Sequence, residues 1–170
     1  EKDALGIMPT GAGKSVCFQV PAIMFTGITL VISPLISLMK DQVSALTQSG
    51  VRAAYINASL TERQIDLVLQ RAQEGCYKII YVSPERLESD KFLLMCSNIE
   101  VSMVCIDEAH CVSQWGHDFR PGYLKIKDFI ERFRIRPVVS AFTATATERV
   151  REDIVELLGL DDPVSCVTSF

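Results

Sequence analysis

Residues 8–15 read MPTGAGKS, and this stretch decides the fold because it lies between a predicted strand and a predicted helix. A strand-like run at residues 4–8 leads into it and a helical segment follows, which is the setting in which a glycine-rich loop binds phosphate. The stretch matches the pattern GxxxxGK[ST] at every fixed position except the first, which is Met8. The expected fold class is α/β, with a mostly parallel central sheet and helices on both faces.

The chemistry of this loop assigns roles to its residues. Gly11 and Gly13 let backbone N–H groups curl toward phosphate oxygens, and the following helix points its positive end at the anion. We expect Lys14 to reach the β- and γ-phosphates and the Ser15 hydroxyl to bind Mg²⁺. The alternative is a glycine-rich turn with a merely solvated lysine. With ATP and Mg²⁺ as the expected cofactors, the nucleotide-binding residues are Thr10, Gly11, Ala12, Gly13, Lys14 and Ser15.

Short apolar runs alternate with helical patterns along the rest of the chain. The helical spacing is clearest at Ile65, Val68, Leu69 and Ala72. Strands are expected at 4–8, 28–32, 51–56, 78–82, 101–106 and 137–142, with a further possible strand at 164–168. The runs at 28–32 and 101–106 are almost continuously apolar, which predicts central strands covered on both faces.

Capping residues predict where helices begin and end. Each serine of Ser33-Pro34 and Ser83-Pro84 is expected to cap a helix that starts at the proline. Thr61 with Gln64 and Thr145 with Glu148 fit capping boxes, and Gly159 suits a helix end.

Composition bounds the class of protein. A chain of 170 residues, 48% of them hydrophobic, is long enough for one domain. Its net charge of −4 and pI near 5.2 argue against a broad basic surface that wraps DNA, so nucleic-acid contacts are expected to be local. No apolar run approaches the ~18 residues of a membrane span, and no secretory signal is visible, so we expect a cytoplasmic protein. The six cysteines form no CxxC pair and indicate neither a metal site nor a disulfide framework.

A second chemical motif, Asp107-Glu108-Ala109-His110, follows the predicted strand at 101–106. An acidic residue at this place in a phosphate-loop enzyme holds Mg²⁺, and a neighbouring carboxylate activates water. We expect Asp107 on the metal, Glu108 as general base, and His110 as a link between the nucleotide site and a moving neighbour. The alternative is that the two carboxylates only cap the next element. Lys14, Asp107, Glu108 and His110 are the predicted catalytic residues.

These motifs carry a resemblance to a known family. MPTGAGKS together with DEAH resembles superfamily 2 helicases, and CVSQWGHDFRPGY at 111–123 is similar to the aromatic-rich loop of RecQ helicases. SPLISLMKDQ at 33–42, YVSPERL at 81–87 and FTATAT at 142–147 follow that family's order over nearly all 170 residues. The resemblance implies the first RecA-like motor domain of a bacterial-type, 3'-to-5' DNA helicase that couples ATP hydrolysis to translocation on single strands and unwinding of duplexes.

The aromatic-rich loop has a physical interpretation of its own. Trp115, Phe119 and Tyr123 are spaced by four, with His117 and Arg120 between them, in a stretch too rich in Gly and Pro for a stable helix. Exposed rings here offer faces for base stacking, worth about 1–3 kcal/mol per base. The alternative is that Trp115 and Phe119 fill a small core.

The resemblance assigns further residues to DNA binding and coupling. Ser33, Pro34 and Ser83 are expected against the DNA backbone, although plain helix capping explains both serines equally well. Lys40 and Arg86 are either backbone contacts or solvated charges. Thr143 and Thr145 are expected to connect nucleotide state to domain motion. The full set of expected DNA-binding and coupling residues is Ser33, Pro34, Ser83, Gln114, Trp115, His117, Phe119, Arg120, Thr143 and Thr145.

The resemblance also implies parts outside this chain. We expect one domain over 1–170, cut before an adenine-reading motif and before a second RecA-like domain with an arginine finger worth about 10³–10⁵ in rate. The fragment alone is thus expected to be weakly active or inactive. Expected partners are single-stranded and duplex DNA and the second domain, in a monomer near the nucleoid, or in the nucleus of a eukaryote. Two alternatives remain: an RNA helicase with the same DEAH motif, and a non-catalytic nucleotide-binding module.

Overall fold

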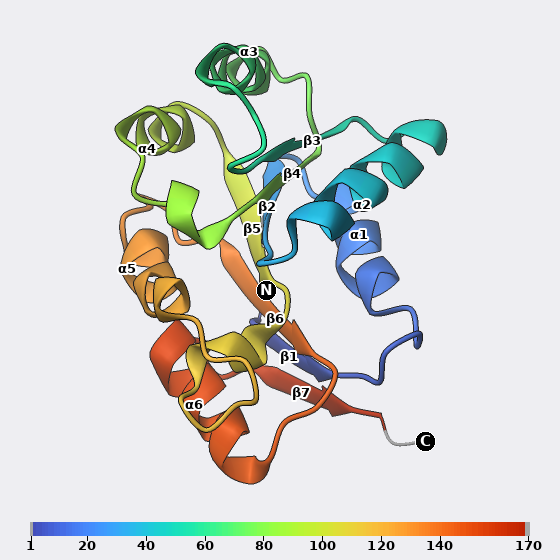
Figure 1. Ribbon diagram of the computed structural model, residues 1–170, viewed down its shortest axis with the longest axis vertical. Helices are drawn as coiled ribbons and strands as arrows, with labels where there is room; N and C mark the ends of the chain where they lie inside the picture. The colour runs from blue at the N-terminus through green and yellow to red at the C-terminus, as the bar shows by residue number, and fades with distance from the viewer. Residues whose placement is uncertain (1, 169–170) are drawn as a thin grey trace.

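The computed structural model describes residues 2–168, in which strands and helices alternate (Figure 1). The strands are β1 (Ala4–Ile7), β2 (Ile28–Ile32), β3 (Ala53–Ile56), β4 (Ile79–Val82), β5 (Val101–Ile106), β6 (Val138–Thr143) and β7 (Val164–Val167). The α-helices are α1 (Lys14–Met24), α2 (Ile36–Gln48), α3 (Glu62–Gln73), α4 (Asp90–Ser97), α5 (Ile126–Glu131) and α6 (Glu148–Leu158). Three short 3-10 helices are η1 (Pro84–Arg86), η2 (Ala109–Val112) and η3 (Pro121–Lys125).

The seven strands form one sheet in the order β3-β4-β2-β5-β6-β1-β7, and every neighbouring pair is parallel. The expected α/β fold is therefore confirmed, including the interior positions of the strands at 28–32 and 101–106. Because parallel strands all end at one edge, the segments that follow β1, β2, β5 and β6 share that edge.

Alternation along the strands explains why helices cover both faces. In β2, Ile28, Leu30 and Ile32 face the larger hydrophobic core, whereas Val31 faces the smaller one. The larger core lies under α3, α4, α5 and α6, and the smaller core lies under α1 and α2 (Figure 1). Within residues 2–168, no helix combines the length and apolarity that crossing a bilayer requires.

Some of the predicted helix ends are confirmed. Thr61 and Gln64 form a complete capping box at the start of α3, in which the Gln64 amide donates to the Thr61 side chain over 3.3 Å. Gly159 ends α6 with a left-handed backbone, φ 68°.

Two predicted helix starts are wrong. Ser33-Pro34 lies outside α2, because Leu35 is still extended and the helix begins only at Ile36. α6 is capped by Thr147, whose hydroxyl accepts from the Val150 amide, and not by Thr145. Both errors place the start too early, at the first capping residue that follows the strand.

Ser83-Pro84 does begin a helical segment. That segment is only the three-residue η1, and the Ser83 side chain makes no capping hydrogen bond there.

Candidate nucleotide and nucleic-acid site

The phosphate loop joins β1 to α1 at the carboxyl edge of the sheet. Gly11 (φ 86°) and Gly13 (φ 80°) have left-handed backbones, which non-glycine residues rarely adopt. A Cβ at either glycine would meet no atom within 4 Å, so the loop requires glycine for its backbone conformation and not for space. Gly13 caps α1 without a side chain, so the amide groups of the first turn have no side-chain acceptor. Such a helix start favours an anion.

Lys14 brings the two chemical motifs together. Its Nζ lies 3.3 Å from Asp107 Oδ1 and 3.3 Å from Glu108 Oε1, although more than ninety residues separate the lysine from the carboxylates. The phosphate loop and the DEAH segment therefore converge on one point. Thr10 and Ala12 are exposed in the loop, and Ser15 is half-buried in the first turn of α1. Their roles toward the nucleotide and the metal remain predictions.

The environment of Asp107 favours additional positive charge. Burial raises the pKa of Asp107, the nearby Lys14 ammonium lowers it, and the neighbouring Glu108 raises it again. The two carboxylates share the single positive charge of Lys14, so a net negative charge remains in a largely buried position. Oxygen donors of this kind, with the Ser15 hydroxyl, fit the preference of Mg²⁺.

Glu108 is held in an unusual backbone conformation. Its φ of 50° and ψ of 45° make it, with Asp162, one of two non-glycine residues among 2–168 with positive φ. The turn ends β5 and directs the carboxylate so that Oε1 meets Lys14 and Oε2 lies 3.4 Å from His110 Nδ1. Strain of this type, on the order of 1–3 kcal/mol, persists where the surrounding structure enforces it, as at functional sites.

His110 connects the DEAH segment to the end of β6. Its Nδ1 lies 2.7 Å from the Thr143 hydroxyl, which itself donates to the Thr145 carbonyl oxygen. Thr143 also accepts a hydrogen bond from the Met8 amide through its backbone oxygen, which joins the phosphate loop to the same point. Burial and the neighbouring His117 lower the pKa of His110, which favours the neutral ring.

The aromatic-rich loop packs directly on the DEAH segment. A Cβ on Gly116 would lie 2.6 Å from the His110 carbonyl oxygen, so only glycine permits this approach. The His117 ring stacks on the His110 ring with centroids 4.1 Å apart, and the Arg120 amide donates to the Cys111 carbonyl. A displacement of the loop must therefore disturb the residues next to Glu108.

The aromatic side chains of this loop differ in exposure. Trp115 is 65% exposed, which excludes the alternative in which it fills a core, and Phe119 is half-buried. The expectation that Tyr123 offers a stacking face is wrong, because its ring is fully buried and its hydroxyl donates to the Asp107 carbonyl oxygen. The turn of η3 places Tyr123 beneath the end of β5, where it supports the carboxylates.

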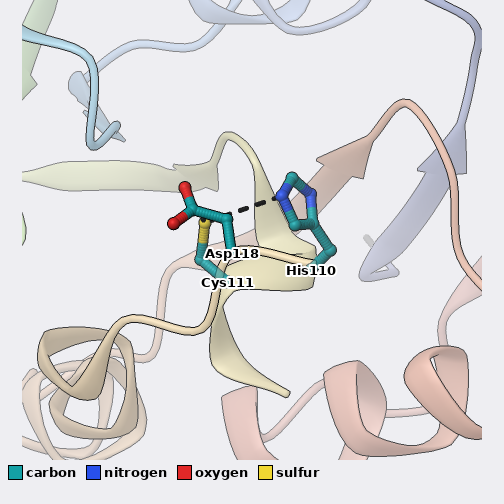
Figure 2. A group of neighbouring side chains, drawn as sticks. All are labelled: His110, Cys111 and Asp118. Carbon is teal, nitrogen blue, oxygen red and sulfur yellow. Dashed lines mark hydrogen bonds between the residues drawn. The ribbon is translucent and has the colours of Figure 1, made fainter. Parts of the chain in front are cut away.

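Three potential ligand side chains, His110, Cys111 and Asp118, lie within 4.8 Å of one another at the base of the loop (Figure 2). No spacing motif in the sequence indicates this group. Arg120 already donates two hydrogen bonds to Asp118 Oδ2, at 3.0 and 3.1 Å, so that carboxylate is paired with a cation. Burial raises the pKa of Cys111 to about 12, which keeps the thiol protonated. We assign the cluster to packing of the loop.

The remaining predicted DNA contacts lie on the same edge of the sheet. Ser33 and Ser83 follow the adjacent strands β2 and β4, but only 2% and 4% of their surfaces are exposed. Ser33 Oγ accepts from the Leu35 amide over 3.5 Å. Pro34 is half-buried, and Lys40, Gln114 and Thr145 are exposed. Arg86 lies 3.7 Å from Glu62. Their roles toward DNA remain predictions.

Two residues of α6 belong to this site and were missed by sequence reasoning. The Arg149 guanidinium lies 4.4 Å from the centre of the Trp115 ring. The Ser113 hydroxyl donates to Asp153 over 2.6 Å. Both lie on an amphipathic helix, where charges are ordinarily solvated, so nothing in their sequence positions distinguishes them.

Comparisons with known proteins agree with this arrangement. The family described as DEAD/DEAH box helicase matches residues 1–154. An ATP-dependent DNA helicase RecQ from Bacillus subtilis is 51% identical over 96% of the chain, and one from Pasteurella multocida is 48% identical over 99%. The chain spans only 28% and 27% of the lengths of these curated relatives.

Solved structures agree in fold at low identity. The Hef helicase domain of Pyrococcus furiosus is superimposed with a TM-score of 0.72 at 19% identity, covering 98% of this chain and 36% of that one. A hypothetical ATP-dependent RNA helicase from Sulfolobus tokodaii gives 0.74 at 19% identity, covering 98% and 48%. With the match that extends over residues 1–154, these observations lead to one conclusion: the chain belongs to the DEAD/DEAH box helicase family.

Proposed function

We propose that this chain is the ATP-binding motor domain of a RecQ-type DNA helicase, which hydrolyses ATP with Mg²⁺ and couples hydrolysis to movement on single-stranded DNA and unwinding of duplexes. The observation that carries the proposal is the contact of Lys14 with both Asp107 and Glu108. The identity to RecQ helicases over nearly the whole chain supports the choice of DNA as substrate.

Each residue of the nucleotide site has a separate task in this proposal. The start of α1 and Lys14 bind the phosphates, while Asp107 and Ser15 hold the metal, which supplies positive charge when bound. Glu108 lies beside Lys14 and accepts the proton of the attacking water, because its carboxylate is held at the edge of the site by the left-handed turn. The hydrogen bond between His110 and Thr143 transmits changes at the nucleotide site to the end of β6.

The loop supplies the link to DNA. The exposed Trp115 ring stacks with a base, and the packing of Gly116 and His117 on His110 transmits that contact to the DEAH segment. Because the chain has a net charge of −4, we expect it to bind DNA through local contacts and not through a broad basic surface.

The proposal includes parts beyond this chain. A second RecA-like domain supplies the arginine finger, worth about 10³–10⁵ in rate, so residues 1–170 alone hydrolyse ATP weakly. The proposed protein has polarity 3'-to-5', works as a monomer, and acts where the DNA is: in the bacterial nucleoid, or in the nucleus of a eukaryote.

Calorimetry of the chain with Mg²⁺ and a non-hydrolysable ATP analogue tests the nucleotide site. We expect saturable binding that Lys14→Ala abolishes, because the phosphates then lose their ammonium partner. Lys127→Ala, which removes an exposed lysine of α5, is the matched control and is expected to bind as the parent does. Equal binding by Lys14→Ala would remove the phosphate loop from the proposal.

Stimulation of the complete protein's ATPase by single-stranded DNA and by RNA of the same length tests the substrate. We expect DNA to stimulate, and Trp115→Ala to lower the stimulated rate more than the basal rate. Stimulation by RNA alone would favour the RNA helicase instead.

A further inference from the structure

The indole ring of Trp115 contacts α6 through the side chain of Arg149. The Arg149 guanidinium lies 4.4 Å from the centre of the indole ring, yet the side chain of Trp115 remains 65% exposed. Among the residues described, Arg149 has no carboxylate within the 4.0 Å of an ion pair. No ion pair among the described residues thus draws the guanidinium away from the ring, and much of the Trp115 surface stays open to solvent.

A second contact fixes the same stretch of loop to the same helix. The buried Ser113 hydroxyl donates to Asp153 over 2.6 Å and accepts from the Trp115 amide over 3.1 Å. Arg149 and Asp153 are four residues apart and so share one face of α6. The backbone of Trp115 and its ring are thus held by neighbouring turns of one helix.

We propose that Arg149 is a positioning residue for DNA sensing, which backs one face of Trp115 and leaves the opposite face free for a base. This inference rests on the proposed role of Trp115 in DNA binding. A ring that already has the orientation required for stacking loses less conformational freedom when the base arrives. A guanidinium behind the ring also interacts favourably with its electron-rich face.

The placement of Arg149 connects base stacking to the nucleotide site by a second route. α6 starts directly after the segment that carries Thr143, and Thr143 bonds His110 and the phosphate-loop amide of Met8. A base that presses on Trp115 therefore acts on α6 through Arg149, in addition to acting on the DEAH segment through the packed loop.

Quenching of Trp115 fluorescence by acrylamide tests the positioning role without DNA. Trp115 is the only tryptophan of the 170 residues, so the signal comes from this ring alone. We expect Arg149→Ala to raise the quenching constant and Arg149→Lys to give an intermediate value. Arg63→Ala, which removes an exposed arginine of α3 at the far side of the molecule, is expected to match the parent. An unchanged constant in Arg149→Ala overturns the inference.

Binding of a labelled single-stranded oligonucleotide to the complete protein, followed by fluorescence anisotropy, tests the consequence. We expect Arg149→Ala to weaken binding about two- to fivefold, which corresponds to about 0.5–1 kcal/mol. The effect should vanish when Trp115→Ala is already present, because the arginine then has no ring to position. Additive effects of the two changes overturn the inference.

The salt dependence of the same binding separates positioning from a phosphate contact. A lost phosphate contact lowers the slope of log affinity against log salt by about 0.7 for a single strand. We expect an unchanged slope in Arg149→Ala, and a slope lowered by that amount overturns the inference. If Trp115→Ala itself leaves DNA binding unaltered, the proposed DNA role of the loop fails. If only Arg149→Ala is without effect, that role stands and the positioning role of Arg149 fails.

Discussion

Glu108 has a left-handed backbone and a carboxylate that contacts Lys14. A glutamine at this position tests the charge of the side chain independently of its size. Glu108→Gln keeps the size of the side chain but removes the carboxylate that we propose as the proton acceptor. In the complete protein we expect the DNA-stimulated ATPase rate to fall by about 10²–10⁴, the usual contribution of a general base. Nucleotide affinity, measured by calorimetry, should stay within a few-fold. Near-full turnover by this variant would assign the base role to another group.

Tyr123 and Trp115 share one loop but have opposite roles, because one ring is buried and the other exposed. Tyr123→Phe removes the hydrogen bond to the Asp107 carbonyl oxygen, and we expect it to lower the free energy of unfolding by about 1–3 kcal/mol. Urea unfolding measures this change. Single-strand affinity should remain within twofold, whereas Trp115→Ala should weaken that affinity and change stability by less than about 0.5 kcal/mol. The reverse pattern would contradict our assignment of the two rings.

At the residue scale, the sequence predicted the side chains that belong to compact motifs. Lys14 was predictable because it belongs to a phosphate-loop pattern that follows one strand-like run. The acidic pair at 107 and 108 directly follows another such run, and parallel strands end at one edge. Tyr123 and Arg149 were not predictable. Their roles depend on the turn of η3 and on the approach of α6 to the loop, and no local pattern encodes either contact.

Thr147 at the start of α6 provides a prediction at the scale of the element. Its hydroxyl accepts from the Val150 amide, so Thr147→Ala should lower the free energy of unfolding by about 0.5–2 kcal/mol. Thr145→Ala is the matched control, and we expect less than about 0.5 kcal/mol because that side chain is exposed and caps nothing. Thermal or urea unfolding of both variants checks the order. A larger loss in Thr145→Ala would restore the start that the sequence predicted.

The elements themselves were more predictable than their ends. All seven strands lie within two residues of the predicted ranges. The pattern is clearest for β2, β4 and β5, because a strand covered on both faces is apolar along nearly its whole length. The starts of α2 and α6 were misplaced for different reasons. After β2 the chain stays extended through Leu35, so Ser33 lies too early to cap α2. After β6 both Thr145 and Thr147 can cap a helix, and the later of the two does so.

Asp3 stabilises the molecule as a whole. It is 3% exposed and accepts hydrogen bonds from Arg136, from the Val139 amide of β6 and from the Asp161 amide beyond α6. Its backbone oxygen accepts from the Val164 amide, which leads into β7. One carboxylate thus joins three parts of the fold that are distant in sequence.

The pH dependence of stability follows from this environment. Burial alone raises the pKa of Asp3, but the hydrogen bonds from Arg136, Asp161 and Val139 outweigh it and hold the pKa below its ordinary value of 3.8. A depressed pKa contributes stability that is present above the unfolded value and is lost as the pH falls through the folded value. We expect Asp3→Asn to lower the free energy of unfolding at pH 7 by about 1.5–3 kcal/mol. The difference from the parent should shrink as the pH falls below 3.8.

Urea unfolding of both proteins between pH 7 and pH 3 measures that difference. Asp162→Asn removes an exposed carboxylate that pairs with Lys2, and it should show almost no difference from the parent at either pH. A difference for Asp3→Asn that stays constant with pH would show that the carboxylate is not the cause.

The position of β1 between β6 and β7 has a consequence for synthesis on the ribosome. The strand that carries the phosphate loop emerges early, but both strands that pair with it are made more than a hundred residues later. Until then the N–H and C=O groups along both edges of β1 have no native partner, and chaperones or non-native strands compete for them. The nascent polypeptide thus acquires its nucleotide pocket only after β6 and β7 have been synthesised.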